Sequence, residues 1–159
     1  MKVKVTPSKV SGNIKIPASK SMAHRALICA SLSNGTSIVS NVTNSKDIEA
    51  TVGRMKALGA KIQQIDETTY KVTGTNLFKQ AGNITCNANE SGSTLRFLIP
   101  LAACTNAKVK FLGQGRLLQR PMDVYANEFK EQNIEFNQSN QEIIVSGNLK
   151  AKDYVVQGD

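Results

Sequence analysis

The spacing of apolar residues along this chain predicts four helices separated by short strands. In residues 46–58 and 121–132 the apolar positions form one stripe, which is typical of a helix with one face in water. Residues 22–32 and 95–104 are apolar on nearly every side, which predicts two helices buried all round, beginning near Ser21 and Gly92. Pro121 suits the first position of its helix, because its missing N–H would be unpaired there.

The same order of predicted helices and strands occurs twice along the sequence. GNIKI (Gly12–Ile16) is echoed by GNITC (Gly82–Cys86), and each copy reads strand, helix, strand, helix, strand, strand. Gly59 ends the second helix, since glycine accepts the left-handed conformation after a helix cap. The strands are expected at residues 13–16, 36–42, 60–65 and 69–74 in the first copy, and at 83–87, 107–112, 134–138 and 142–147 in the second.

These repeats predict an α/β (α+β) fold made of βαβαββ units. Each copy is expected to supply one central helix and one outer helix, so that parallel helices lie inside and sheets lie outside. The expected divisions are an N-terminal strand segment at 1–12, a first unit at 13–75, a second unit at 82–148 and the opening strand of a truncated third unit at 153–159. The expectation is therefore an incomplete domain, a fragment of a longer chain.

Composition and charge narrow the class of protein. The 159 residues are 40% hydrophobic and 20% charged, which is typical of a globular chain. No apolar run has the length of a membrane span and no signal peptide is recognisable, so a cytoplasmic location with no membrane partner is expected. The cysteines, Cys29, Cys86 and Cys104, lack metal-ligand spacing and are expected to be reduced thiols in the core.

A formal charge of +8 attracts anions, including phosphorylated metabolites and nucleic acid. The basic residues are scattered, aromatic residues make up 5% and there is no Trp, which disfavours nucleic acid. A small anionic molecule is therefore the favoured partner.

Polar groups gather at the N-terminal ends of the two all-apolar helices. Lys20, Ser21 and Arg25 lie at the start of the first, where free N–H groups and the helix dipole favour an anion. Arg25 and Arg96, on helices predicted to be buried, need a paired anion or carbonyl acceptors. The simpler alternative is that Ser19 or Ser21 only caps the helix and Lys20 is solvated.

The second helix start carries Gly92, which lets a ligand approach the backbone closely. A plain N-cap by Ser91 explains part of this motif equally well. Arg96 either contacts a ligand or pairs with Glu90 or backbone carbonyls. Arg120, held beside Pro121, is placed to point at a fixed target.

Three further residues carry weaker signals. His24 is either a base or, more in keeping with its place, a hydrogen-bonded structural residue. Asp47 favours the dipole of its own helix. Pro100 lies inside a predicted buried helix and should bend it or break its hydrogen bonding.

Three motifs, PASKSMAHRAL, ANESGSTLRF and GQGRLLQRPMD, occur in an order and spacing that resemble the 5-enolpyruvylshikimate-3-phosphate synthases, or 3-phosphoshikimate 1-carboxyvinyltransferases. The resemblance covers the whole chain, including VTPSKVSGNIKIP near its start. It implies a transferase of the shikimate pathway, which leads to the aromatic amino acids. The implied fold is two inside-out domains of three βαβαββ units each, with ligands between them and the second domain absent here.

The resemblance also implies roles for individual residues. Lys20, Ser21 and Arg25 would bind shikimate 3-phosphate, while Lys20, Gly92 and Arg120 would bind phosphoenolpyruvate, where the herbicide glyphosate competes. Asp47 and Arg96 would support the site. No catalytic residue, metal or organic cofactor is implied for this chain.

The implied reaction joins the 5-hydroxyl of shikimate 3-phosphate to carbon 2 of phosphoenolpyruvate and releases phosphate. A Ser-Ser-Gln substrate motif and the acid/base residues of the second domain are missing, so this chain alone is expected to lack turnover and to bind ligand weakly at best. The alternatives are a UDP-N-acetylglucosamine enolpyruvyl transferase, whose typical loop cysteine is absent from residues 113–120, a non-catalytic module for phosphorylated ligands or RNA, and a mere folding unit.

Overall fold

The computed structural model describes residues 3–155. Along this part of the chain the elements are α1 (Lys20–Leu32), β1 (Thr36–Val39), α2 (Lys46–Ala57), β2 (Lys61–Gln64), β3 (Tyr70–Thr73), β4 (Ala81–Asn87), α3 (Gly92–Ala102), β5 (Asn106–Leu112), α4 (Asp123–Glu131), β6 (Glu135–Gln138) and β7 (Ile143–Ser146). Short 3₁₀ turns lie at Leu77–Lys79 and Leu117–Gln119. Helices and strands alternate as the sequence predicts, which confirms the α/β class.

The strands form two separate sheets, one from each copy of the repeat. The first is antiparallel with the order β1-β3-β2, and the second has the order β4-β5-β7-β6. In the second sheet β4 and β5 run parallel and pair from Ala81–Asn106 to Asn87–Leu112. On β5 the side chains of Ala107, Val109 and Phe111 are buried, because alternate residues of a strand face the same side.

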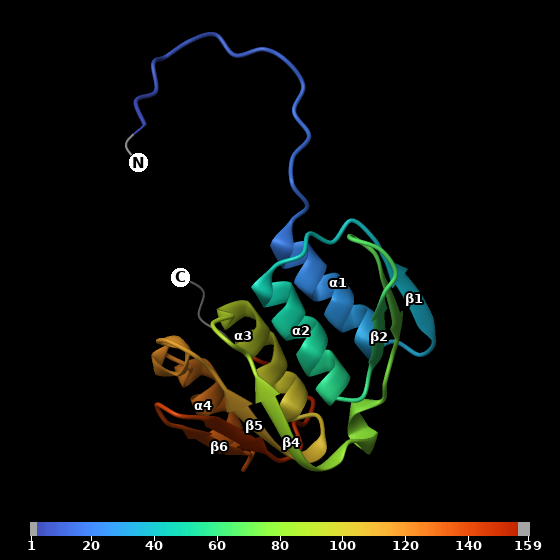
Figure 1. Ribbon diagram of the computed structural model, residues 1–159. Helices are drawn as coiled ribbons and strands as arrows, with labels where there is room; N and C mark the ends of the chain where they lie inside the picture. Colours follow the sequence, from blue (N-terminus) through green and yellow to red (C-terminus); the bar gives the residue numbers. More distant parts are fainter. Residues whose placement is uncertain (1–2, 156–159) are drawn as a thin grey trace.

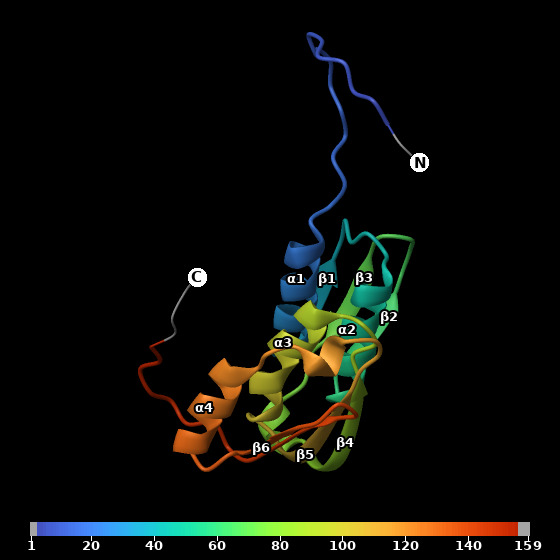
Figure 2. The same cartoon turned by 90° about the vertical axis from the view of Figure 1, so that its left-hand side faces the viewer.

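The helices α1, α2 and α3 lie side by side and parallel, with their N-terminal ends together (Figure 1). Helices α1 and α2 pack on the first sheet, α3 packs on β5 and β7, and α2 also contacts β4. Figure 2 shows α4 on the far side of α3 from α1. One apolar core joins both copies, and it includes Leu27, Ile48, Met55, Leu98 and Phe111, each with no exposed surface.

The prediction that α1 is central and α2 is outer is wrong. Helix α2 lies between α1 and α3, and its Ile48 and Met55 are completely covered. Helix α1 lies at the edge of the helical layer and has an open face, on which Met22 is 62% exposed. An apolar helix can therefore look buried on all sides in sequence and still lack neighbours on one side.

The three cysteines differ in exposure according to the element that carries them. Cys29 lies on the open face of α1 and is exposed, so its assignment to the core is wrong. Cys86 on β4 is buried, and burial raises the pKa of its thiol to about 11. Cys104 is half-buried, and burial raises its pKa as well.

The expected first strand of the first copy does not form. Residues 3–19 contain no strand, and Ile14 and Ile16 are 87% and 76% exposed. Figure 1 shows this segment running away from the body of the molecule. Residues 153–155 of the expected third unit are not a strand either, and the rest of that prediction, like residues 1–2, lies outside the described residues. A strand needs a hydrogen-bonding neighbour, and neither segment has one within residues 3–155.

Two of the predicted helix boundaries are informative. Gly59 has a φ of 100° and follows the cap of α2 at Leu58, as expected for a glycine that ends a helix. Pro121 is not the first residue of α4, which begins at Asp123. The prediction for Pro121 fails because Gln138 Nε2 donates to the backbone oxygens of Leu118 and Arg120, which holds this stretch as part of the loop.

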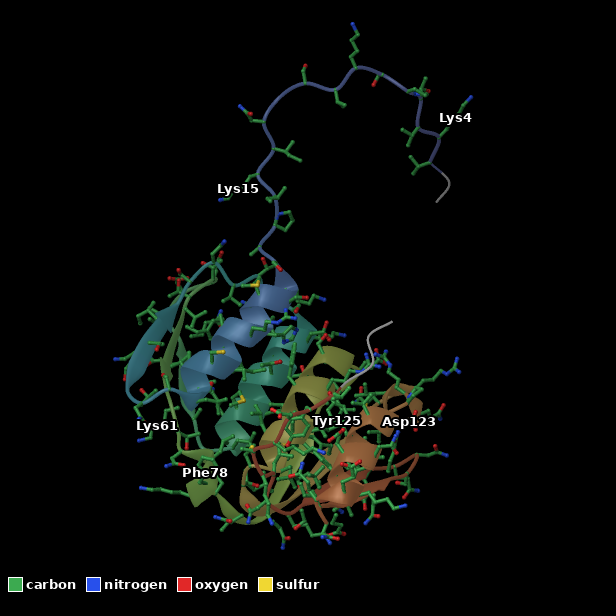
Figure 3. The ribbon with its side chains drawn as sticks, turned by 180° about the vertical axis from the view of Figure 1, so that it is seen from behind. Lys4, Lys15, Lys61, Phe78, Asp123 and Tyr125 are labelled. Carbon is green, nitrogen blue, oxygen red and sulfur yellow. The ribbon has the colours of Figure 1, made fainter. Side chains whose placement is uncertain are left out.

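Pro100 does not break α3, which continues to Ala102. A proline has no N–H, so the backbone oxygen of Arg96, four residues earlier, lacks its helical donor. The hydroxyl of Tyr125 on α4 donates to that oxygen at 2.9 Å. Figure 3 shows Tyr125 where α4 faces α3. A side chain from a neighbouring helix thus replaces the missing backbone hydrogen bond.

Candidate anion-binding site

The starts of α1, α2 and α3 are capped in the same way. The hydroxyl oxygens of Ser19, Ser45 and Ser91 each accept a hydrogen bond at 3.3 Å from the backbone N–H three residues later. One first-turn donor of each helix is satisfied in this way, and other first-turn N–H groups lack helical partners. Because the three ends lie together, their partial positive charges add at one place.

Two contacts tie these helix starts to one another. Lys20 Nζ of α1 donates to Asp47 Oδ2 of α2 at 2.9 Å. The hydroxyl of Thr94 of α3 lies 3.4 Å from the backbone oxygen of Asp47. Asp47, which the sequence suggested only as a dipole partner, therefore lies at the junction of all three helices.

The Lys20–Asp47 pair is partly solvated, with side-chain exposures of 55% and 35%. Such a pair adds little to stability, so its main effect is to hold Lys20 in place. The hydrogen bond from Lys20 is the largest cause that lowers the pKa of Asp47, with burial acting in the opposite direction. Asp47 is therefore ionised at neutral pH.

Arg25 lies beside this pair but is not buried. Its guanidinium stands 5.2 Å from the centre of the Phe97 ring on α3, and its Nη1 donates to the backbone oxygen of Ser21 at 3.1 Å. The argument that Arg25 and Arg96 need a buried partner is wrong, because both side chains are exposed. Ser21 is exposed as well, so the predicted group at the start of α1 faces open solution.

Gly92 and Arg120, far apart in sequence, are in direct contact. A Cβ atom placed on Gly92 would collide with Arg120 Nη1, so the flexible end of Arg120 would have to move aside. The loop carrying Arg120 is anchored by the buried side chains of Leu117 and Leu118. The missing side chain at Gly92 thus gives the Arg120 guanidinium its place at the start of α3.

Arg96 is not joined to this group. Within residues 3–155 no ion pair links Arg96 to Glu90, which was one of its expected partners. Its backbone oxygen accepts from Tyr125, whose pKa is raised by burial and lowered to a lesser extent by the Arg96 charge. The contacts of Arg96 thus support the packing of α3 on α4.

His24 lies beneath the site with 1% of its surface exposed. Its Nδ1 is 2.7 Å from the Thr51 hydroxyl. Burial is the largest cause that lowers the pKa of His24; Asp47 opposes it, and Lys20 and Arg25 reinforce it. A buried neutral imidazole in a hydrogen bond agrees with the structural interpretation of this residue and not with a base that meets a substrate.

Sequence reasoning missed the buried hydroxyls under the site. Thr51 and Thr94 are fully covered, and their oxygens are 2.8 Å apart between α2 and α3. The available signal was a threonine on the apolar stripe of its helix, since a buried hydroxyl requires a partner. Phe97, the platform for Arg25, carried no signal beyond its apolar character.

Two further observations describe the rest of the molecule. None of the helices within residues 3–155 combines the length and the apolar character needed to cross a bilayer. In the same residues no three His, Cys, Asp or Glu side chains gather closely enough to hold a metal ion.

Comparison with known proteins gives a consistent result. A family model described as EPSP synthase (3-phosphoshikimate 1-carboxyvinyltransferase) matches residues 4–158. The 3-phosphoshikimate 1-carboxyvinyltransferases of Clostridium perfringens strain SM101 and Clostridium kluyveri are each 45% identical to this chain, over 160 and 159 residues. Both alignments cover 99% of this chain but only 38% and 37% of the relatives. The chain thus spans little more than a third of their length.

Solved structures agree on the fold. An EPSP synthase from Acinetobacter baumannii superimposes with a TM-score of 0.74 at 20% identity, covering 90% of this chain and 34% of that one. Another structure of EPSP synthase from the same organism gives 0.72 at 19% identity, covering 86% and 32%. At these identities the likeness shows a shared fold.

Proposed function

The chain belongs to the EPSP synthase family, and we propose that it forms the anion-binding half of a site that transfers the enolpyruvyl group of phosphoenolpyruvate to the 5-hydroxyl of shikimate 3-phosphate. The observation that carries the proposal is the meeting of three helix N-termini with the cations Lys20, Arg25 and Arg120. Both substrates are anions, and helix N-termini with nearby arginines are suited to phosphate and carboxylate groups. In this proposal the enzyme works in the cytoplasm, and the remainder of the longer protein closes the site.

Shikimate 3-phosphate is assigned to the start of α1. Lys20, Ser21 and Arg25 are exposed there and present an ammonium, a hydroxyl and a guanidinium to the same side. Arg25 is held by Phe97 and by the backbone oxygen of Ser21, which leaves other N–H groups of its guanidinium free to donate. A phosphate placed here would accept charge-assisted hydrogen bonds from all three side chains.

Phosphoenolpyruvate is assigned to Lys20, Gly92 and Arg120. The close approach of Arg120 to the Gly92 backbone puts a guanidinium beside the first-turn N–H groups of α3. Lys20, on the neighbouring helix start, would reach both substrates. Asp47 and Arg96 are assigned supporting roles, the first by holding Lys20 and the second through the packing of α3 on α4.

The proposed reaction forms one bond before it breaks another. The 5-hydroxyl oxygen loses its proton and attacks carbon 2 of phosphoenolpyruvate while carbon 3 takes up a proton, which gives a tetrahedral intermediate. Loss of a proton from carbon 3 restores the double bond as phosphate leaves with the electrons of its C–O bond. In this scheme the residues of this chain stabilise negative charge and orient the two substrates. We assign them no proton transfer, because His24 is buried and neutral.

The first test is a calorimetric titration of this chain with shikimate 3-phosphate. We expect weak but saturable binding, and Arg25→Ala should weaken it about tenfold or more, since a hydrogen bond to a charged group contributes about 1.5–3 kcal/mol. Lys61→Ala is the control, because Lys61 lies at the opposite end of the helical layer (Figure 3). Absence of saturable binding to a chain that is folded by circular dichroism would contradict the proposal.

The second assignment is tested with phosphoenolpyruvate in the presence of shikimate 3-phosphate. Gly92→Ala should displace Arg120 and weaken binding about tenfold. Gly53→Ala on α2 is the matched control, because a Cβ there meets no atom within 4 Å. Equal affinities for the two variants would remove Gly92 and Arg120 from the site. Binding that prefers RNA and weakens steeply with salt would instead favour a nucleic-acid module.

A further inference from the structure

A chain of buried hydrogen bonds runs beneath the proposed site and crosses all three helices. His24 Nδ1 of α1 is 2.7 Å from the Thr51 hydroxyl of α2, which is 2.8 Å from the Thr94 hydroxyl of α3. The Thr94 hydroxyl lies 2.7 Å from Ser91 Oγ at the start of α3. The Thr94 hydroxyl also lies 3.4 Å from the backbone oxygen of Asp47 at the start of α2.

The end at Thr94 determines the direction of every bond in this chain. The Thr94 hydroxyl donates toward Ser91 Oγ and toward the backbone oxygen of Asp47, and a carbonyl oxygen only accepts hydrogen bonds. Thr94 must therefore accept from Thr51, since a hydroxyl has one proton to donate.

The same reasoning fixes the proton on the imidazole. Because the hydroxyl proton of Thr51 goes to Thr94, the Thr51 oxygen must accept from His24. A neutral histidine carries one N–H, so the proton sits on Nδ1 and Nε2 keeps a lone pair.

The surroundings of Nε2 support this direction independently. Nε2 of His24 is buried and has no hydrogen-bond partner among the described residues. With the chain reversed, Nε2 would carry a buried N–H without an acceptor, and buried N–H groups without partners are rare in folded proteins. An unprotonated Nε2 next to apolar side chains avoids that arrangement.

We propose that His24, Thr51, Thr94 and Ser91 form a polarised hydrogen-bond relay that holds the starts of α2 and α3 together beneath the Lys20–Asp47 pair, with His24 as its Nδ1–H tautomer. His24 is then a positioning residue, which acts through three hydroxyl groups and touches neither substrate. The proposal rests on the proposed function only for the identity of the anion that Lys20 meets. The relay itself is tested without any ligand.

The relay gives the three helix starts a common alignment. Lys20 and Asp47 are partly solvated, so their own attraction holds them only weakly. The buried Thr94 hydroxyl fixes the rotamer of Ser91 and holds the Asp47 backbone against α3. Breaking the relay should therefore loosen the Asp47–Lys20 contact while the fold is retained.

The experiment exploits the fact that the chain contains a single histidine. A long-range proton–nitrogen NMR spectrum of protein labelled with the heavy nitrogen isotope at histidine distinguishes the two tautomers without any assignment problem. At neutral pH the wild-type chain should give the Nδ1–H pattern, although free histidine in water favours Nε2–H. An Nε2–H pattern, an even mixture or a doubly protonated ring would overturn the proposal.

A variant remote from the ring tests the relay as a unit. In Thr94→Val the Thr51 hydroxyl loses its acceptor and can donate to Nδ1 instead, so the share of the Nε2–H tautomer should rise even though Nε2 lacks an acceptor. Thr105→Val is the matched control, because Thr105 is an equally buried threonine whose hydroxyl bonds only its own neighbourhood. If Thr94→Val does not fold, Thr51→Val removes the hydroxyl that accepts from Nδ1 and should likewise raise the share of the Nε2–H tautomer. A folded variant whose tautomer share equals that of the wild type would refute the relay.

Discussion

The two copies of the βαβαββ pattern begin with nearly the same letters, yet only the second forms its opening strand. GNITC lies within β4, which pairs with β5 along seven positions. GNIKI, at Gly12–Ile16, is exposed and pairs with nothing among residues 3–155. A strand-like sequence therefore shows that a segment is able to form a strand. Whether the strand forms depends on a neighbouring strand with which it can hydrogen bond.

The first helices of the copies differ in a similar way. When Arg25 is aligned with Arg96, His24 matches Leu95 and Cys29 matches Pro100. The two helix starts are both capped by serine and both lie at the site. Inside the helices, however, one copy carries a buried imidazole and the other a proline, and each requires a hydrogen-bonding partner from elsewhere in the fold.

The largest expected effect on the free energy of unfolding comes from placing a lysine at the equivalent position of each copy, in β4 and in the exposed segment 13–16. Cys86→Lys buries an ammonium in β4 close to Arg54 and should lower the free energy of unfolding by about 3 kcal/mol or more. The equivalent Ile16→Lys lies in the exposed segment and should change it by less than about 0.5 kcal/mol. Urea denaturation measures both. Similar losses in the two variants would mean that residues 13–16 pack against the body in solution.

An intermediate effect on the pH dependence of stability is expected from His24, whose counterpart in the second copy is Leu95. Burial lowers the pKa of His24, so between the unfolded value near 6.5 and the lower folded value the unfolded chain binds more protons. Stability should therefore fall as pH drops below about 6.5, with a slope of at most about 1.4 kcal/mol per pH unit, the limit for one proton. Thermal or urea unfolding at a series of pH values checks this.

His24→Leu makes the first copy resemble the second and should remove this slope. Asp47 acts in a different range, because its pKa is lowered from an ordinary value near 3.8 and its contribution disappears only as pH falls below that value. A slope between pH 6.5 and 5 that persists in His24→Leu would show that another group causes it.

The smallest expected effect on the free energy of unfolding concerns Pro100, the proline inside α3 of the second copy. Tyr125→Phe removes the donor to the Arg96 backbone oxygen and should lower the free energy of unfolding by about 0.5–1 kcal/mol. Adding Pro100→Ala supplies a backbone N–H at the helical position and should recover this loss. A double variant no more stable than Tyr125→Phe would show that the hydroxyl does not replace the missing helical bond.

Much of the local structure could be read from the sequence. The predicted helix 46–58 and strand 107–112 differ from α2 and β5 by a single residue at one end. Lys20, Ser21 and Arg25 were grouped from their places at one helix start, where an anion is favoured, whereas Gly92 and Arg120 were joined to them only through the resemblance to a known family. The burial of α1 on all sides, by contrast, was inferred from composition, and composition does not reveal which side of a helix has a neighbour.

By itself, the sequence determined which segments form the four helices and most of the strands, and where α1, α2 and α3 begin. Capping serines, apolar periods and the glycine after α2 act over about four residues, a range within which neighbours in sequence are neighbours in space. Only the tertiary structure decided that α2 is central, that Arg120 rests on Gly92 and that His24 connects to Asp47 through hydroxyl groups. Those outcomes depend on residues 27 to 47 positions apart, whose contacts arise from packing.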